Sequence, residues 1–215
     1  MSGGTHRVRL LRRARVAEHT LELVLSKPKG FLFAPGQSIR IVEPGAERDY
    51  SIASGPLDPC LVILVRLVER GVLTPILASA PLERTFLIEG PRGYFTCAPT
   101  TLPLVFAATG TGAAPFLSMA RAGLSGFTML HGVRQVGDML YPGELRAAAA
   151  LFVPCVSRGP AGDSFSGRVT EWVKQRLAPR RYDFYLCGRQ EMIGDMTVLV
   201  DDRFPGSRVH TEIFF

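Results

Sequence analysis

The first half of the chain contains short stretches, separated by Gly and Pro, in which apolar and polar residues alternate, together with one stretch, residues 61–68, that is nearly all apolar. Alternation with a period of two is typical of strands that bury one face. It is imperfect in the first stretch, residues 8–15. Strands are predicted at residues 8–15, 20–25, 37–42, 61–68 and 85–89, and one short helix at 75–80. Short strands at regular spacing predict a small antiparallel barrel or sandwich.

The pattern changes near residue 100. Residues 104–108 form a continuous apolar run, as expected for a strand buried on both faces. Strands and helices then alternate, with strands predicted at 104–108, 127–131, 152–156, 183–187 and 208–214, and helices at 115–121, 144–150, 169–177 and 190–200. Such alternation predicts a doubly wound parallel sheet covered on both faces. We therefore expect two domains, an antiparallel β-barrel at residues 1–99 and an α/β domain at residues 100–215.

Composition and charge narrow the function classes. The formal net charge of +6 favours acidic partners, but the basic residues form no stripe interleaved with aromatics, so nucleic-acid binding is not expected. No apolar run approaches the roughly 18 residues of a membrane span, and no signal-peptide core is recognisable. The chain has four widely spaced cysteines, Cys60, Cys97, Cys155 and Cys187. They form no metal-binding pair, so we predict no metal site. We expect their thiols to be reduced and the protein to be cytoplasmic.

A glycine-rich turn lies between the predicted strand at 104–108 and the predicted helix at 115–121. Its sequence is Thr109-Gly110-Thr111-Gly112. Glycines there would let a phosphate approach the backbone, and the helix N-terminus would offer free N–H groups. Taken alone, the turn fits an ordinary strand-to-helix connection equally well.

Four further motifs could contribute to a ligand site. Residues 48–51 read R-D-Y-S and could reach one ligand from a strand, although an exposed strand with a cross-strand Tyr explains them as well. Residues 71–74 read as a helix start with Thr74 near the cap, and residues 90–95 as a Gly-Pro-x-Gly turn. Cys187-Gly188 ends a predicted parallel strand, at the edge where doubly wound sheets bind ligands.

The order of these motifs is more specific than any one of them. R-x-Y-S, G-x-x-[ST], G-P-x-G-x-F, G-T-G-x-x-P, C-G and an aromatic C-terminus follow one another along the chain. This order resembles the ferredoxin–NADP reductase family over essentially the whole chain. The compact bacterial members end in Glu-x-aromatic-aromatic, matched here by residues 212–215. The family pairs an FAD-binding antiparallel barrel with a nicotinamide-nucleotide-binding α/β domain.

The resemblance implies roles for residues in the first domain. Arg48 would bind the FAD pyrophosphate, Tyr50 would stack on the isoalloxazine, and Ser51 would hydrogen-bond near flavin N5. A second segment would present backbone N–H groups or a hydroxyl to the flavin phosphates, namely Val72, Leu73 and Thr74. Thr74 stands where Ser is common, which keeps the hydroxyl.

The resemblance also implies roles in the second domain. The G-T-G turn would hold the nicotinamide-nucleotide pyrophosphate, and Cys187 with Gly188 would lie beside the nicotinamide ring. Phe215 would cover the other face of the flavin. The nucleotide-binding residues of the turn are Gly110, Thr111 and Gly112, and the residues assigned to the reacting centre are Ser51, Cys187 and Glu212.

Three arginines favour NADPH over NADH. Arg134 follows the second predicted strand of the α/β domain, Ser157-Arg158 follows the third, and Arg168 precedes the third helix. Because successive strand ends meet at one edge of the sheet, these side chains can converge on a 2′-phosphate. They also match positions at which NADP-using relatives hold that phosphate. NAD(H) stays open, because NADH-using relatives often keep the first arginine and Asp163 lies in the same loop.

The expected activity is an FAD-dependent transfer of hydride between NADP(H) and flavin, with single electrons passing to or from ferredoxin or flavodoxin. The cofactor carries this chemistry, so no acid–base dyad is required, and the histidines read as isolated residues at positions 6, 19, 131 and 210. One alternative is an NADH-dependent reductase component that serves an oxygenase, for which the cysteine pattern excludes a fused iron–sulfur cluster. Another is a non-catalytic flavoprotein subunit that relays electrons. We expect a monomer.

Overall fold

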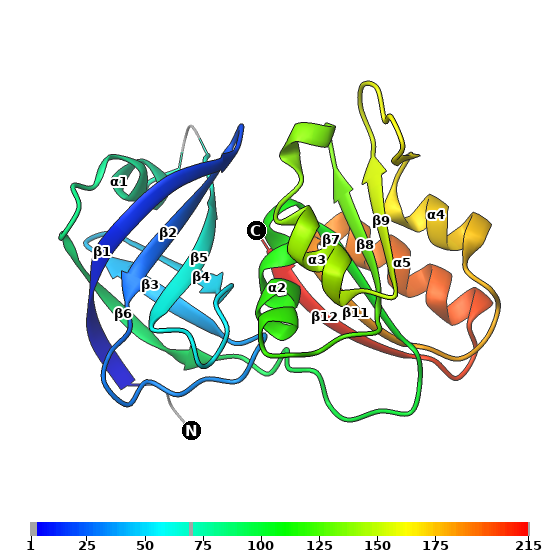
Figure 1. The fold of residues 1–215 in the computed structure, drawn as a ribbon, viewed down its shortest axis with the longest axis horizontal. Helices are drawn as coiled ribbons and strands as arrows, with labels where there is room; N and C mark the ends of the chain where they lie inside the picture. The colour runs from blue at the N-terminus through cyan, green and yellow to red at the C-terminus, as the bar shows by residue number, and fades with distance from the viewer. Residues whose placement is uncertain (1–3, 69–70, 215) are drawn as a thin grey trace. The chain divides into compact units, whose positions relative to one another are not determined.

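The computed structural model describes residues 4–68 and 71–214 and divides the chain into two compact units (Figure 1). The first unit contains residues up to Cys97 together with Ala114–Ala122. The second contains Ala98–Ala113 and Gly123–Phe215. Residues Ala114–Ala122, which the predicted boundary places in the second domain, therefore group with the first unit.

The first unit is built on six antiparallel strands in the order β4-β3-β6-β1-β2-β5. A bridge between Ile52, just beyond β4, and Ile63 of β5 joins the two end strands, so the sheet closes into a barrel. The strands are β1 (Gly4–Ala17), β2 (Thr20–Ser26), β3 (Ser38–Glu43), β4 (Ala46–Ser51), β5 (Cys60–Arg66) and β6 (Thr85–Arg92), and one helix follows β5, α1 (Leu73–Ser79). The predicted antiparallel barrel is confirmed.

A register shift in β1 explains the imperfect alternation of its sequence. Leu10 pairs with Leu25 of β2, but Arg12 pairs with Val24, so β1 carries an irregularity between Leu10 and Arg12. An extra residue in one strand of a pair exchanges the faces on which later side chains lie. A strictly alternating pattern therefore could not continue through residues 8–15.

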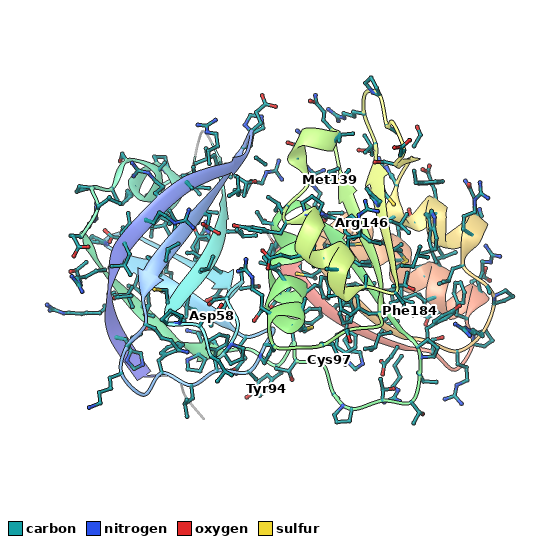
Figure 2. All side chains as sticks on the ribbon, viewed as in Figure 1. Asp58, Tyr94, Cys97, Met139, Arg146 and Phe184 are labelled. Carbon is teal, nitrogen blue, oxygen red and sulfur yellow. The ribbon has the colours of Figure 1, made fainter. Side chains whose placement is uncertain are left out.

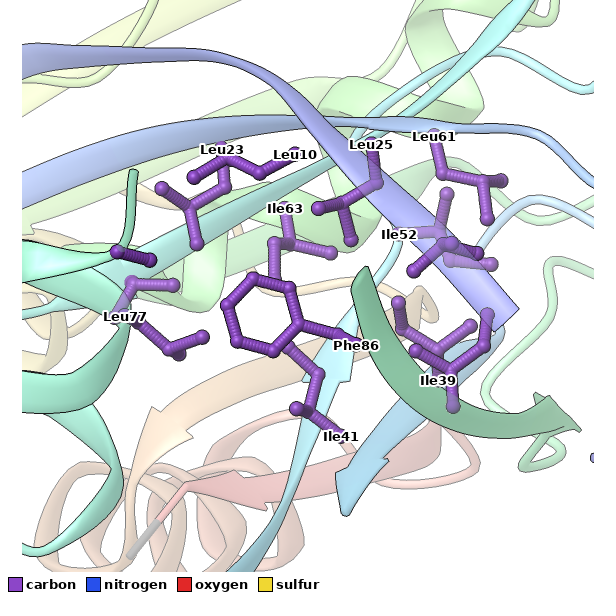
Figure 3. Packing of buried hydrophobic residues seen from close by; sticks show 14 of the residues in the cluster. Leu10, Leu23, Leu25, Ile39, Ile41, Ile52, Leu61, Ile63, Leu77 and Phe86 are labelled. Carbon is purple, nitrogen blue, oxygen red and sulfur yellow. The ribbon is translucent and has the colours of Figure 1, made fainter. Parts of the chain in front are cut away.

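The interior of the barrel is filled by aliphatic side chains packed around Phe86. Figure 3 shows the Phe86 ring among residues of β2, β3, β5 and α1. The fully buried members labelled there include Leu10, Leu23, Leu25, Ile39, Ile41, Ile52, Leu61, Ile63 and Leu77. They come from alternate positions along the strands, as expected where one strand face is buried. This core supports β4, the strand that carries the R-x-Y-S motif.

The sheet of the second unit contains six parallel strands in the order β10-β9-β8-β7-β11-β12. The strands are β7 (Leu104–Thr109), β8 (Thr128–Val133), β9 (Leu151–Val156), β10 (Phe165–Ser166), β11 (Asp183–Arg189) and β12 (Arg208–Phe214). The helical segments between them are η1 (Gly110–Ala113), α2 (Ala114–Arg121), η2 (Val136–Asp138), α3 (Pro142–Ala148), α4 (Val169–Arg176) and α5 (Gln190–Arg203). The two-residue strand β10 and the 3₁₀ segments were not predicted.

Helices cover both faces of this sheet, as predicted. Residues of α4 and α5 pack with Val153, Phe184 and their neighbours on one face, and Figure 2 labels Phe184 there. On α3, the guanidinium of Arg146 lies 5.2 Å from the ring centroid of Phe152. Phe152 precedes Val153 in β9 and therefore points to the opposite face. The fold class, an antiparallel barrel with a doubly wound parallel-sheet domain, is confirmed.

The order of strands places a crossover beside β7. The chain runs outward from β7 through β8 to β9, then returns to place β11 on the other side of β7. In doubly wound sheets, ligands bind at the carboxyl ends of the strands where the order reverses. Here the glycine-rich turn follows β7, and Cys187-Gly188 lies near the end of β11.

The structure also bears on the membrane prediction. Among the helices of residues 4–68 and 71–214, none has both the length and the apolar character needed to cross a membrane.

Candidate flavin and nucleotide sites

Strand β4 separates its acidic residues from its basic and aromatic ones. Arg40 of β3 pairs with Asp49, donating from Nε to Oδ1 at 2.9 Å and from Nη2 to Oδ2 at 2.8 Å. Arg40 also donates to Glu47 at 2.7 Å. Glu47 and Asp49 thus share one face of the strand, and Arg48 and Tyr50 lie on the other. The ion pair with Arg40 lowers the pKa of Asp49.

Tyr50 and Arg48 provide an aromatic ring and a cation side by side. Tyr50 is half-buried and packs against the barrel core, and burial raises the pKa of its phenol to about 12. The phenol is therefore neutral at physiological pH. Arg48 is exposed, with one guanidinium N–H donating to the carbonyl of Glu47 at 2.7 Å, and Ser51 is buried. The structure thus brings these three predicted residues together at one end of β4.

The predicted phosphate segment opens helix α1, which contacts β4. Val72 is the N-cap residue and is exposed, and Leu73 begins the helix. Thr74 lies near the cap as expected, but its hydroxyl donates to the carbonyl of Val68 at 3.0 Å instead of accepting from a helix N–H. No acidic residue stands in the first turn, so this end of α1 does not repel an anion.

The two glycines of the turn in the second unit differ in what surrounds the position of a side chain. Gly110 has a positive φ of 53°, and a Cβ built there would meet nothing within 4 Å. A Cβ at Gly112 would lie 2.3 Å from the carbonyl oxygen of Cys187. Gly110 therefore leaves the backbone open to a ligand, whereas Gly112 allows the end of β11 to approach. Packing against β11 thus explains why position 112 lacks a side chain, and a role for Gly112 in binding a phosphate stays a prediction.

Side chains fasten the turn to the strands on both sides. The hydroxyl of Thr109 accepts a hydrogen bond from the backbone N–H of Arg189 at 2.9 Å. On the other side, Nε2 of His131 in β8 lies 3.2 Å from the carbonyl oxygen of Gly110. His131 is fully buried, and burial lowers its pKa to about 4. Neither Thr109 nor His131 was assigned this role of holding the turn from the sequence alone. A His inside an otherwise apolar strand was a visible signal for His131.

Cys187 lies opposite Glu212 in the register of β11 and β12. Its thiol donates to Oε2 of Glu212 across 3.7 Å, and the thiol is fully buried. Burial and then the Glu212 carboxylate raise the pKa of Cys187 well above its usual value. The thiol therefore stays protonated and is no nucleophile. The structure thus brings Cys187 and Glu212 into contact, whereas Ser51, the third residue assigned to the reacting centre, lies in the first unit. Phe215 lies outside the described residues.

The predicted 2′-phosphate residues share one edge of the parallel sheet. The backbone N–H of Arg158 donates to the carbonyl of Arg134 at 2.9 Å, and the hydroxyl of Ser157 donates to the carbonyl of Val133 at 3.1 Å. Arg168 follows Gly167, whose N–H donates to the end of β9. All three arginines are exposed, and their side chains have no ion-pair partner among residues 4–68 and 71–214. Three cations at one edge attract an anion.

One histidine that read as isolated has a partner at the far end of the sheet. Nε2 of His210 lies 2.8 Å from Oδ1 of Asp183, and Asp183 is buried. Asp183 begins β11, whereas Cys187 and Gly188 lie toward its carboxyl end. The pair therefore stands apart from the nucleotide-binding edge. In the described part of the chain, no cluster of three or more His, Cys, Asp or Glu side chains could hold a metal ion.

The donors present fit two phosphate-containing ligands. In the first unit, exposed Arg48 and the neutral ring of Tyr50 suit an anionic, aromatic cofactor such as FAD. In the second unit, the open backbone at Gly110 suits a pyrophosphate, since a side chain there would cover the peptide groups.

Comparison with known proteins identifies the class. Residues 106–197 match the oxidoreductase NAD-binding domain family. The chain is 38% identical over 213 residues to ferredoxin–NADP reductase B of Sorangium cellulosum, covering 86% of each protein. The chain belongs to the ferredoxin–NADP reductase family, as the order of motifs predicted.

Other relatives are larger proteins. The toluate 1,2-dioxygenase electron transfer component of Pseudomonas putida is 29% identical over 175 residues, which cover 75% of this chain and 52% of that protein. The chain thus spans about half the length of several relatives named as oxygenase components. Its similarity to the Sorangium reductase extends over most of both chains.

Solved structures share the complete fold. A ferredoxin NADP⁺ reductase from Neisseria gonorrhoeae, crystallised with bound FAD and NADP, has a TM-score of 0.85 and 22% identity, covering 98% of this chain and 99% of its own. A cytochrome P450 reductase from Amycolatopsis has a TM-score of 0.86 and 26% identity, covering 99% of this chain and 71% of its own. The predicted cofactors, FAD and NADP(H), agree with the ligands of the gonococcal relative. The individual site residues and the domain limits remain predictions.

Proposed function

We propose that this protein is an FAD-dependent reductase that transfers hydride between NADP(H) and flavin and exchanges single electrons with ferredoxin or flavodoxin. The observation that carries the proposal is that one chain of this family has two sites suited to these ligands, one in each unit. The Arg48–Tyr50 face of β4 suits a flavin dinucleotide, and the open turn at Gly110 suits a nicotinamide dinucleotide. We also propose that it acts as a monomer in the cytoplasm.

In the barrel, the residues of β4 and α1 would hold FAD. Arg48 supplies a cation for the pyrophosphate, and the face it shares with Tyr50 is free of carboxylates because Arg40 holds Glu47 and Asp49 on the other face. Tyr50 offers a neutral ring for stacking, and Ser51 offers a hydroxyl. When bound, FAD supplies the chemistry, since it accepts two electrons as hydride and releases them singly.

In the second unit, the residues at the ends of β7 and β11 would bind and orient the nicotinamide nucleotide. Gly110, Thr111 and Gly112 present backbone to the pyrophosphate, and the thiol of Cys187 keeps its proton at Sγ through burial and Glu212. A protonated thiol is compact and uncharged, so it can line a hydride-transfer site without attacking the ring. The exposed arginines at positions 134, 158 and 168 would bind the 2′-phosphate.

A second function, that of an NADH-dependent component that delivers electrons to an oxygenase, is favoured by the named relatives. A naphthalene 1,2-dioxygenase and salicylate 5-hydroxylase reductase component from Ralstonia is 32% identical over 91% of this chain. The two proposals share the flavin residues and differ in coenzyme and electron acceptor. The arginines at the sheet edge favour the first, because NADH has no 2′-phosphate for them to bind.

The test is a coenzyme and acceptor comparison on purified holoprotein. The flavin released by denaturation is identified by chromatography, and kcat/KM is measured for NADPH and NADH with ferricyanide, then with ferredoxin and flavodoxin. We expect FAD, a preference for NADPH, and reduction of at least one carrier protein. Recovery of FMN alone would contradict the flavin assignment, and a preference for NADH would favour the oxygenase-component function.

A further inference from the structure

A histidine is buried directly beneath the nucleotide-binding turn. His131 occupies the fourth position of β8, next to β7, and is fully buried. Its Nε2 lies 3.2 Å from the carbonyl oxygen of Gly110, and its Nδ1 has no hydrogen-bond partner among the described residues. A polar ring in an apolar strand costs stability unless its hydrogen bonds compensate. Among the described residues, the one hydrogen bond of its ring is with Gly110 of the turn.

We propose that His131 is a positioning residue for the nicotinamide nucleotide, whose Nε2–H donates to the Gly110 carbonyl and thereby aims the following N–H, that of Thr111, toward the pyrophosphate. The inference rests on the proposed function, because it assigns a role within the nucleotide-binding turn. His131 itself touches no ligand and acts through the backbone.

The direction of the hydrogen bond follows from chemistry. A carbonyl oxygen only accepts, so the nitrogen that faces Gly110 must carry the proton. Nδ1 then needs none, and the ring is neutral. Burial supports this state, since it lowers the pKa of His131 to about 4. His131 is thus an uncharged donor across the physiological range and brings no buried charge toward the turn.

The consequence for the turn follows from peptide geometry. The Gly110–Thr111 peptide is trans, and a trans peptide is planar with its C=O and N–H pointing in opposite directions. If His131 holds the carbonyl inward, the N–H of Thr111 must point away from the ring. Gly110 adopts a φ of 53°, and a Cβ built there would meet no atom within 4 Å. Because glycine is conformationally permissive, a hydrogen bond to its carbonyl is needed to restrain this peptide.

The bond from His131 complements the one from Thr109. Thr109 accepts from the N–H of Arg189 in β11, on the side of β7 opposite β8. Strand β7 and the start of the turn are thus fixed to both neighbouring strands. The hydrogen bond to the Thr109 hydroxyl fixes the residue before Gly110, and the hydrogen bond from His131 fixes the Gly110 carbonyl, which belongs to the peptide that presents the Thr111 N–H.

The test compares two replacements of His131 in the holoprotein. His131→Phe keeps a planar ring but removes the donor, whereas His131→Gln keeps an amide N–H of similar reach. Dissociation constants are measured for NADP⁺ and for adenosine 2′-monophosphate, which lacks the pyrophosphate, by the change in flavin absorbance or by competition. Leu130→Val, in the neighbouring buried position of β8, is the control for a general disturbance of the strand.

We expect His131→Phe to weaken NADP⁺ binding about threefold to tenfold, the range of one net hydrogen bond, with FAD content and adenosine 2′-monophosphate binding unchanged. His131→Gln should restore NADP⁺ binding to within about twofold of wild type. If His131→Phe does not fold, His131→Leu takes its place in the comparison. The role of His131 would be overturned if His131→Phe left the NADP⁺ affinity unchanged, or if it weakened the binding of NADP⁺ and adenosine 2′-monophosphate equally. It would also be overturned if Leu130→Val weakened NADP⁺ binding as much as His131→Phe does. Failure of the wild-type protein to bind NADP⁺ would instead overturn the proposed function.

Discussion

The buried histidine predicts a specific acid sensitivity of the second unit. In an unfolded chain, His131 has an ordinary pKa near 6.5, whereas burial lowers the folded value to about 4. The unfolded chain therefore binds a proton between these values that the folded protein does not. The contribution is fully present above about pH 6.5 and is lost as the pH falls toward 4. Replacing His131 by Phe should remove this sensitivity, because Phe does not titrate.

The two pKa values fix the size of the effect. Linkage gives a loss of about 2 kcal/mol of unfolding free energy at pH 5 and about 3 kcal/mol at pH 4, relative to neutral pH. The single tryptophan, Trp172 on α4, lies in the second unit and reports its unfolding by fluorescence in urea titrations. The measured quantity is the difference between wild type and His131→Phe in the change of unfolding free energy from pH 7.5 to pH 5.

Other groups that titrate over this range contribute equally to both proteins, so the comparison isolates His131. We expect wild type to lose about 2 kcal/mol more than the variant. Equal losses in the two proteins would refute the reasoning, since they would mean that His131 has the same pKa folded and unfolded. His131→Gln, which also does not titrate, should behave like the Phe variant.

Three further predictions follow from contacts described above. Gly112→Ala should destabilise the second unit by about 1–3 kcal/mol, because the added Cβ would meet backbone atoms. Gly137→Ala, where a Cβ meets open space, should change stability by less than about 1 kcal/mol, and equal effects of the two replacements in urea titrations would contradict this. Replacing Arg158 and Arg168 together by Ala should raise the KM for NADPH at least about tenfold and leave that for NADH nearly unchanged, since each charged contact contributes about 1.5–3 kcal/mol; equal changes would show that neither arginine binds the 2′-phosphate. Phe86→Ala should cost the barrel about 3–5 kcal/mol in thermal or chemical unfolding, and a loss below about 1 kcal/mol would show that the core collapses around the gap.

Much of the fold could be predicted because burial leaves a periodic trace in the sequence. The strand at 104–108 and its partners read as continuous apolar runs, and the sheet indeed buries them on both faces. The two-residue strand β10 left no such trace, because two residues define no period. The grouping of Ala114–Ala122 with the first unit also could not be read, since a helix pattern indicates a buried face but not what covers it.

The candidate site was predictable where chemistry is carried by side chains in a strand or loop. Arg48 and Tyr50 fall on one face of β4 because a strand alternates. The role of Arg40 was invisible, because it depends on the pairing of β3 with β4. The same applies to Gly112 and His131. Gly112 is constrained by the carbonyl of a residue 75 positions later, and His131 contacts Gly110 only through the parallel pairing of β7 with β8.

The bridge between Ile52 and Ile63 has a consequence for solubility. An unpaired sheet edge is a template on which other chains can add strands and aggregate. Closing the barrel removes both of its edges, and the parallel sheet ends on one side in the two-residue strand β10, too short to serve as a template. Among the described strands, β12 is then the one long edge, and it carries Arg208, His210 and Glu212 at alternate positions. Charged and titratable side chains on an edge strand oppose the addition of a second copy.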